Sequence, residues 1–329
     1  MRERGHAIVA LVLLSPITAE LLTASSPPLE FFFPLTFAFL VALYGSGVLL
    51  VRELTIRWNK SWMSVLLLGA AYGVIEEGVL VKSFFNPNWI DLGALAGFGR
   101  WGGVNWVWSI WLTVFHGIVS IAVPIILINL LYPQLKRERL TSDLQLLTLG
   151  IIFIFIVLPG QTLFVYSPET YLQLLALMMA VVLFFAAREM PRDWPRMKSK
   201  APTLTPQYFY AFGLLFMFFA FFIVYALPER DTPPSTVVTL FFLLCLGIFL
   251  AITNTAGRRF NEKALFSLVA GILSPLIALS FIHEASNQLG MSLVGIGYAA
   301  FLLFLMLKVW WEAPEATAGK VPLRAGKEL

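Results

Sequence analysis

Charged residues are scarce in this sequence, and cysteine is almost absent. Asp, Glu, Lys and Arg make up 13% of the chain, whereas hydrophobic residues make up 59%, and the mean hydropathy is +0.81. These values are far from those of an average soluble domain. The single cysteine, Cys245, can form neither an internal disulfide nor a cysteine metal cluster, so we interpret it as a packing residue. The sequence also lacks a Walker-type phosphate loop and an HExxH zinc signature.

Apolar runs close to membrane-spanning length follow one another along the whole chain. A transmembrane helix needs about 20 predominantly apolar residues. We therefore predict an all-α, polytopic transmembrane helix bundle that forms a single integral membrane domain over residues 1–329, without a second soluble domain. The first run resembles a signal peptide in having a basic end, but we interpret it as a span. The ten predicted spans lie at roughly 6–24, 30–51, 61–85, 105–132, 144–164, 169–187, 207–227, 235–255, 264–286 and 290–311.

The basic residues are distributed unevenly between alternate connections. Of the 23 Lys and Arg residues, only Lys82, Arg100 and Arg230 fall on the side opposite the N-terminus. This asymmetry follows the positive-inside rule, so it predicts that both termini are cytoplasmic and that the protein is a multi-pass protein of a prokaryotic cytoplasmic membrane. We interpret the net charge of +4 as a topology signal, with the basic residues in contact with membrane lipids. We expect no nucleic-acid partner.

Two adjacent glutamates, Glu76 and Glu77, interrupt the third apolar run in the stretch YGVIEEGVL. A carboxylate inside a membrane helix is costly, so it normally faces the bundle interior and finds a partner there. Gly69, Gly73 and Glu77 are spaced at i, i+4 and i+8, which predicts a small-residue seam for close approach of another helix. Glu77 is expected to face that seam. Glu76, one residue and about 100° away, is expected to turn toward another helix or a cavity.

Two of the three histidines, His116 and His283, lie in the outer halves of predicted spans. Each is the centre of a polar stripe with i, i+3 and i+7 spacing: Thr113, His116 and Ser120 in one span, and Ser280, His283 and Asn287 in another. Counted from the outer ends of the spans, His116 lies at a depth of about 16 Å and the glutamates at about 12 to 14 Å. We therefore predict that His116 meets a glutamate. By the same count, His283 lies about 10 Å nearer the outer surface.

The outer connection from Phe85 to Trp111 is rich in glycine and tryptophan. Its tryptophans are typical of an aromatic belt at the membrane interface, although they could also line a substrate groove. Asp91 and Arg100 have opposite charges, so they are candidates for an ion pair across this loop.

Three short motifs resemble those of the CPBP family of intramembrane endopeptidases, which includes type II CAAX prenyl proteases, bacteriocin-processing proteins and abortive-infection proteins. Glu76 and Glu77 are similar to its EExxxR motif, with Val81 at the arginine position and Lys82 next. The segment from Leu112 to His116 is similar to its FxxxH motif, with leucine in place of phenylalanine. The segment 283–287 is similar to its HxxxN motif. The resemblance is best over residues 61–132.

This resemblance implies roles for the motif residues. Glu76 would be the activating base beside Glu77, His116 and His283 would hold the catalytic water or a metal, and Asn287 would stabilise the oxyanion. If a metal is bound, the expected ion is Zn²⁺, held by Glu76, His116 and His283. The implied substrate is a membrane-embedded or lipidated peptide, and some relatives of this kind are inactive scaffolds.

The residues themselves are compatible with more than one function. A buried glutamate can take a proton from water, a neutral imidazole can orient that water or bind Zn²⁺, and an asparagine amide can donate to an oxyanion. This chemistry hydrolyses a peptide bond in or near the membrane. A Glu/His chain also suits a proton-coupled transporter. Alternatively, the same side chains only form contacts between helices in a non-catalytic scaffold.

Overall fold

The computed structural model describes residues 2–192, 194, 204–255 and 260–312. Within this part of the chain, ten helices are long and apolar enough to cross a membrane, which confirms the predicted helical bundle. From the fourth span onward, the limits lie within two residues of the predicted ones. The first span lies earlier than predicted, at Arg2–Leu21, the second lies later, at Pro34–Arg57, and the third ends earlier, at Leu80. The spans are Arg2–Leu21, Pro34–Arg57, Trp62–Leu80, Trp106–Leu131, Asp143–Leu163, Thr170–Glu189, Pro206–Ala226, Pro234–Thr255, Glu262–Ala285 and Met291–Trp311.

Several spans are composite, because an α-helix continues directly into a π-helical or 3₁₀ segment. The α-helices are α1 (Arg2–Pro16), α2 (Pro28–Phe31), α3 (Pro34–Arg57), α4 (Trp62–Val74), α5 (Trp106–Phe115), α6 (Val123–Leu131), α7 (Asp143–Gly160), α8 (Thr170–Glu189), α9 (Pro206–Phe221), α10 (Pro234–Thr255), α11 (Glu262–Ala285) and α12 (Met291–Glu312). The π-helical segments are η1 (Ile17–Leu21), η2 (Ile75–Leu80), η4 (His116–Ala122) and η7 (Phe222–Ala226). The 3₁₀ segments are η3 (Ile90–Leu95), η5 (Pro133–Leu135), η6 (Gln161–Leu163) and η8 (Pro228–Arg230).

Local sequence signals explain where many of these helices begin. Proline occupies the first turn of α3 and α9, where its missing N–H costs no hydrogen bond. Asn105 caps α5 by accepting from the Trp108 N–H, and Ser142 forms a capping box with Gln145 at the start of α7. The outer loop before α5 contains the only two strands among the described residues, β1 (Arg100–Trp101) and β2 (Val104–Asn105), paired antiparallel.

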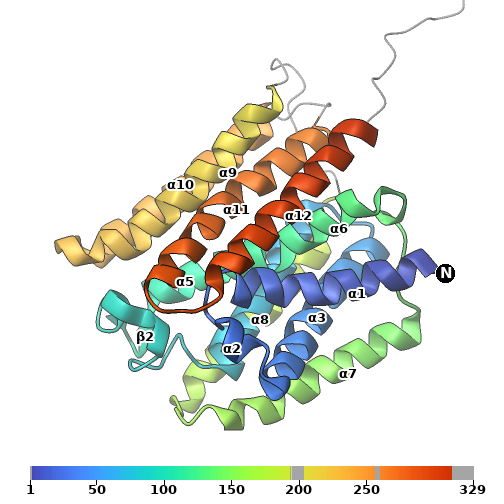
Figure 1. The fold of residues 1–329 in the computed structure, drawn as a ribbon. Helices are drawn as coiled ribbons and strands as arrows, with labels where there is room; N and C mark the ends of the chain where they lie inside the picture. The colour runs from blue at the N-terminus through green and yellow to red at the C-terminus, as the bar shows by residue number, and fades with distance from the viewer. Residues whose placement is uncertain (1, 193, 195–203, 256–259, 313–329) are drawn as a thin grey trace, which may run out of the picture.

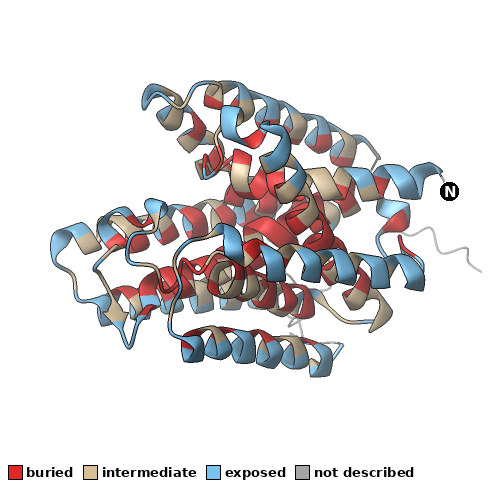
Figure 2. Ribbon diagram, turned by 90° about the horizontal axis from the view of Figure 1, so that it is seen from below, coloured by how far each residue is buried: buried red, intermediate tan, exposed pale blue. Residues whose placement is uncertain are grey.

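The helices form two groups that meet at the fourth span. In Figure 1, α9, α10, α11 and α12 lie together on one side of the molecule, and α1, α3, α7 and α8 lie on the other. Helix α4 packs against α8 and α3. The α5–η4–α6 span is the most enclosed, with 72% of its most apolar window buried, against 11% for α7 and α10. Figure 2 shows the buried residues concentrated in the middle of the bundle and the exposed ones on its rim. His116 therefore lies on the central span.

The later end of the second span changes the surroundings of two charged residues. We expected Arg52 to lie in an inner connection, but α3 continues to Arg57, and both Arg52 and Glu53 are buried. Glu53 pairs with Arg52 and Arg57, and it accepts hydrogen bonds from the Leu140 and Thr141 backbone and from the Thr141 hydroxyl. We call this set, with the carbonyls that Arg52 and Arg57 also bind, the inner ion network.

Candidate functional site

Three π-helical segments carry three glutamates and a histidine that lie near one another in the bundle interior. Segment η2 contains Glu76 and Glu77, η4 begins with His116, and η1 contains Glu20. A π-helical turn inserts an extra residue into an α-helix, which makes it rare, and such turns occur frequently at functional sites. Each of these three turns directly continues an α-helix, so the polar side chains are displayed within otherwise apolar spans.

Glycines bring the helices carrying these residues into close contact. A Cβ atom added at Gly69 would lie 2.9 Å from the Gly117 Cα, and one added at Gly73 would lie 2.7 Å from the His116 Cβ. Both distances are shorter than real Cβ contacts allow, so only glycine permits this approach. The predicted seam of Gly69, Gly73 and Glu77 is thus confirmed, and it places the imidazole of His116 directly beside the two carboxylates.

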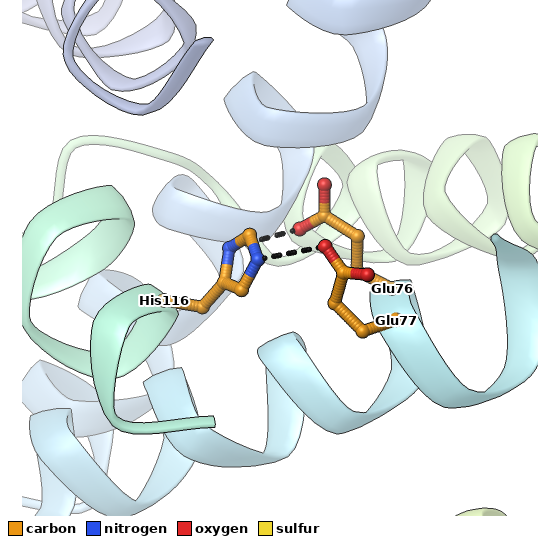
Figure 3. Close-up of side chains that lie close together, drawn as sticks. All are labelled: Glu76, Glu77 and His116. Atoms are coloured by element: carbon orange, nitrogen blue, oxygen red, sulfur yellow. Dashed lines mark hydrogen bonds and ion pairs between the residues drawn. The ribbon is translucent and has the colours of Figure 1, made fainter. Parts of the chain in front are cut away.

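His116 faces both glutamates, whose carboxylates lie together on one side of the imidazole, as Figure 3 shows. Its Nε2 atom is 3.1 Å from Glu77 Oε1, and its Nδ1 atom is 3.3 Å from Glu76 Oε2. The Ser120 hydroxyl also lies 3.0 Å from Nδ1. Only 4% of the Glu76 and His116 side chains and 12% of the Glu77 side chain is exposed. These contacts confirm the predicted meeting, and we call Glu76, Glu77 and His116 the glutamate–histidine cluster.

The carboxylates of Glu76 and Glu77 lie closer together than expected from the 100° between successive residues of an α-helix. Both reach the same imidazole, because they lie in a π-helical turn rather than an α-helical one. Apart from this shared imidazole, Glu76 and Glu77 have different neighbours, as expected. Glu77 also accepts a hydrogen bond from the Ser83 hydroxyl, which in turn accepts from Trp108 Nε1 at 3.0 Å. Glu76 instead lies next to Tyr72.

Two buried polar atoms in this region lack a hydrogen-bond partner in the part of the chain that the structure describes. They are Glu76 Oε2 and the hydroxyl of Tyr72. These two groups interact electrostatically without reaching hydrogen-bond geometry. The Tyr72 and His116 rings are in a T-shaped contact, with centroids 6.1 Å apart. Because buried polar groups nearly always have a hydrogen-bond partner, two atoms without one indicate a place for a water, a cation or a substrate group.

Sequence reasoning missed a third carboxylate, Glu20, and its partner Tyr44. The Tyr44 hydroxyl donates to Glu20 Oε1, and the Ser26 hydroxyl donates to Glu20 Oε2 at 3.0 Å. The Tyr44 ring stacks on His116 with centroids 6.3 Å apart. An available signal was the acidic residue inside the first apolar run, since an ionisable residue in a span is by default a functional candidate.

The third predicted motif does not join the cluster. His283 lies near the end of α11 and is half-buried, and Asn287 is exposed in the turn after that helix, with a φ of 68°. Among the described residues, the group whose ligand atoms approach within 4.8 Å of one another consists of Glu76, Glu77 and His116. The structure therefore brings together the first two motifs and leaves His283 and Asn287 outside.

Lys82, next to the arginine position of the first motif, serves a structural contact. Its ammonium group donates to the carbonyls of Gln161 and Phe164, both at 2.8 Å, which ties the end of the third span to the end of the fifth. Burial lowers the pKa of the Lys82 ammonium. Its backbone adopts a φ of 65°, in the left-handed region.

The predicted pair of Asp91 and Arg100 is not formed. Arg100 instead donates to the backbone carbonyls of Phe85, Asn86 and Ala96 at 2.7 to 2.9 Å, which fixes the outer loop over the end of the third span. Asp91 accepts from Trp89 Nε1 at 3.1 Å. Burial raises the pKa of the Asp91 carboxyl, and the negative charge of Glu77 raises it further. Burial lowers the pKa of Arg100.

The donor set of the cluster fits a divalent metal. Two carboxylates and one imidazole are ligands that Zn²⁺ accepts, and their ligand atoms lie within 4.8 Å of one another. Glu77 thus takes the place that the sequence assigned to His283. Chemically, the arrangement can bind a cation, hold a proton between a carboxylate and an imidazole, or activate a water molecule.

The fold and the site together define a polytopic helical membrane protein with a buried glutamate–histidine cluster. The model of an uncharacterized membrane protein family matches residues 9–316, and the chain belongs to that family. No curated protein and no solved structure matches the chain.

Proposed function

We propose that this protein is a divergent intramembrane hydrolase that cleaves a peptide bond in or near the membrane. The observation that carries the proposal is the convergence of Glu76, Glu77 and His116 on one buried point, from two spans whose packing depends on glycine. Structural packing alone does not explain why two costly carboxylates share one imidazole. The resemblance of these positions to the CPBP motifs supports the same reaction class.

In the proposed reaction, Glu76 is the general base. Its Oε2 atom, which lies 3.3 Å from His116 Nδ1 but makes no hydrogen bond, accepts a proton from water as the water oxygen attacks the peptide carbonyl carbon. The C–N bond then breaks, and the same proton passes to the leaving nitrogen, so that a carboxylic acid and an amine are formed. His116 orients the water through Nδ1, while Glu77 holds the ring through Nε2. If zinc is bound, it would be held by these three residues and would polarise the carbonyl.

Tyr72 supplies a donor for the oxyanion in this scheme, in the role that the sequence motif gave to Asn287. Its hydroxyl is buried and has no partner among the described residues, so its O–H is free to donate. An oxyanion needs such a preorganised donor, and removal of one typically lowers kcat by about 10² to 10³.

The apolar residues on the inner side of the cluster favour a reaction confined to one side of the membrane over proton transfer across it. On the inner side of the cluster, the facing helices contribute buried aliphatic side chains, including Val48, Leu68 and Ile121. One bonded polar chain continues from Glu77 through Ser83 to Trp108, toward the outer ends of the spans, whereas on the inner side His116 contacts Ser120. The proposed substrate is a membrane-embedded or lipidated peptide, in a prokaryotic cytoplasmic membrane.

The test compares the wild-type protein with Glu76→Gln in bilayers. Both are incubated with a library of membrane-spanning and lipidated peptides, with and without chelator, and the products are identified by mass spectrometry. Glu76→Gln keeps the shape of the side chain but removes the proton acceptor, so cleavage should fall by about 10²-fold or more. Tyr72→Phe should lower kcat with little change in KM.

The other possible results of this assay each support a different conclusion. Equal cleavage by both proteins removes Glu76 from the mechanism. Absence of product from both contradicts hydrolysis and favours an inactive relative or a scaffold. A transporter would show pH-dependent uptake that Glu76→Gln abolishes, without peptide product.

A further inference from the structure

A long groove lies between α9, α11 and α12, away from the glutamate–histidine cluster. Its volume is about 480 Å³. Helix α11 forms its floor, because it packs against both α9 and α12, and Figure 1 shows α11 between the other two. The groove does not involve Glu76, Glu77 or His116, so this inference is independent of the proposed function.

Glycine contacts explain why the groove exists. Helices α9 and α11 touch backbone to backbone, since a Cβ atom on Gly213 would lie 2.1 Å from the Leu268 carbonyl oxygen. Helix α12 meets α11 at Gly295, where an added Cβ would lie 2.0 Å from the Ser280 hydroxyl. This contact is near the outer ends of both helices. Toward their inner ends, α9 and α12 stand on opposite sides of α11, and the space between them is the groove.

The two ends of the groove differ in polarity. Gln207 and Trp310 line its inner end, and the Lys263 ammonium lies over the Trp310 ring at 5.6 Å from the centroid. The deeper part is lined by Ala270, Ile277, Ala299 and Leu302. The hydroxyls of Tyr210 and Ser274 are paired with each other at 3.0 Å, so they present no unsatisfied group to an occupant. A cationic mouth with an apolar interior matches an amphiphile with an anionic head.

The length of the groove matches one leaflet of a bilayer. From Trp310 to Ala299 the helix rises about 16 Å, and the hydrocarbon of one leaflet is about 15 Å thick. Trp and Lys are residues that anchor at the membrane interface. The neighbouring Glu262 is neutralised by Lys136 at 3.0 Å, which leaves Lys263 as a positive charge at the mouth. We infer that this groove binds one acyl chain of an anionic phospholipid, with the phosphate beside Lys263.

The full-length protein, reconstituted in nanodiscs with equal dioleoyl phosphatidylglycerol and dioleoyl phosphatidylcholine, provides the test. After release from the nanodisc, native mass spectrometry counts the lipids that remain bound. The wild type should retain phosphatidylglycerol in preference to phosphatidylcholine. Lys263→Gln should lower this preference about fivefold, because one lysine near an anionic headgroup contributes about that factor. Arg188→Gln is the matched control, since Arg188 also lies over a tryptophan, Trp58, but on α8.

Filling the groove with a larger side chain gives a second, independent test. Ala299→Trp should place an indole in the groove and remove the retained lipid. Ala300→Trp, the exposed neighbour that does not line the groove, should leave retention unchanged. Equal retention of both lipids by the wild type, or equal effects of the two tryptophan variants, overturns the inference. Displacement of the lipid by a prenylated peptide at lower concentration than by phosphatidylglycerol would assign the groove to a lipidated peptide and also overturn it.

Discussion

The protein buries two clusters of charged residues, and they are built in opposite ways. In the inner ion network, Glu53 is surrounded by two guanidinium groups and three further donors. Arg52 additionally donates to the carbonyls of Leu135 and Glu138, and only its Nε atom lacks a partner. Arg57 also pairs with Asp143 at 3.1 Å, so two carboxylates balance the two guanidinium groups. The network ties α3 to the connection that precedes α7.

The glutamate–histidine cluster lacks this balance. Glu76 and Glu77 share the single imidazole of His116, and a third carboxylate, Glu20, lies close enough to interact with the same ring. Glu76 and Tyr72 each carry an unpaired polar atom. A buried network that is complete stabilises a fold, whereas an incomplete one has capacity for a proton, a cation or a substrate. The comparison therefore separates a structural network from a candidate functional one.

The largest expected effect distinguishes these two clusters directly. Glu53→Gln should lower the free energy of unfolding by about 3 to 5 kcal/mol, because it leaves the buried Arg52 without its counter-charge. Glu76→Gln should change it by less than about 1 kcal/mol or raise it, because its Oε2 atom makes no hydrogen bond and its contact with the His116 ring at 3.3 Å is shared with Glu77. Equilibrium unfolding in mixed micelles of dodecyl maltoside and sodium dodecyl sulfate measures both. Similar losses for the two variants would contradict the distinction.

An intermediate effect is expected at the glycine seam that positions the cluster. Gly73→Ala places a Cβ 2.7 Å from the His116 Cβ, so α4 and η4 must separate, at a cost of up to about 3 kcal/mol. The same substitution at Gly150 on α7, where a Cβ meets nothing within 4 Å, should be neutral or stabilising by up to about 1 kcal/mol. The same micelle titration compares them. An undiminished stability of Gly73→Ala would mean that the seam is not close-packed.

The seam and the spans were predictable from sequence because each depends on a regular spacing. Apolar run length fixes a span, and the i, i+4 and i+8 spacing of Gly69, Gly73 and Glu77 marks a helix face. A π-helical turn breaks that regularity, which is why the convergence of Glu76 and Glu77 on one ring was not foreseen. His283 shared a local motif but lies outside the cluster, since motif spacing carries no information about which helices pack together.

Glu20 and Arg52 were misjudged for a different reason. Both lie near the ends of apolar runs, where composition does not distinguish a connection from the last turns of a helix. Glu20 lies in the final segment of the first span, and Arg52 lies five residues before the end of α3. Their partners come from distant parts of the chain, Tyr44 for Glu20 and the backbone of residues 135 and 138 for Arg52. Such tertiary partners leave no local pattern in a single sequence.

The smallest expected effect separates two tyrosines that face the same imidazole. Tyr44→Phe removes the hydroxyl that donates to Glu20, so a buried carboxylate loses a donor, and the free energy of unfolding should fall by about 1 to 2 kcal/mol. Tyr72→Phe removes a hydroxyl with no partner among the described residues, so its effect should be within about 0.5 kcal/mol of zero. Both variants keep the aromatic ring, and the difference therefore reports the hydroxyl alone. A loss for Tyr72→Phe as large as that for Tyr44→Phe would show that the Tyr72 hydroxyl already has a bound partner at rest, in which case it would not be free to donate to an oxyanion.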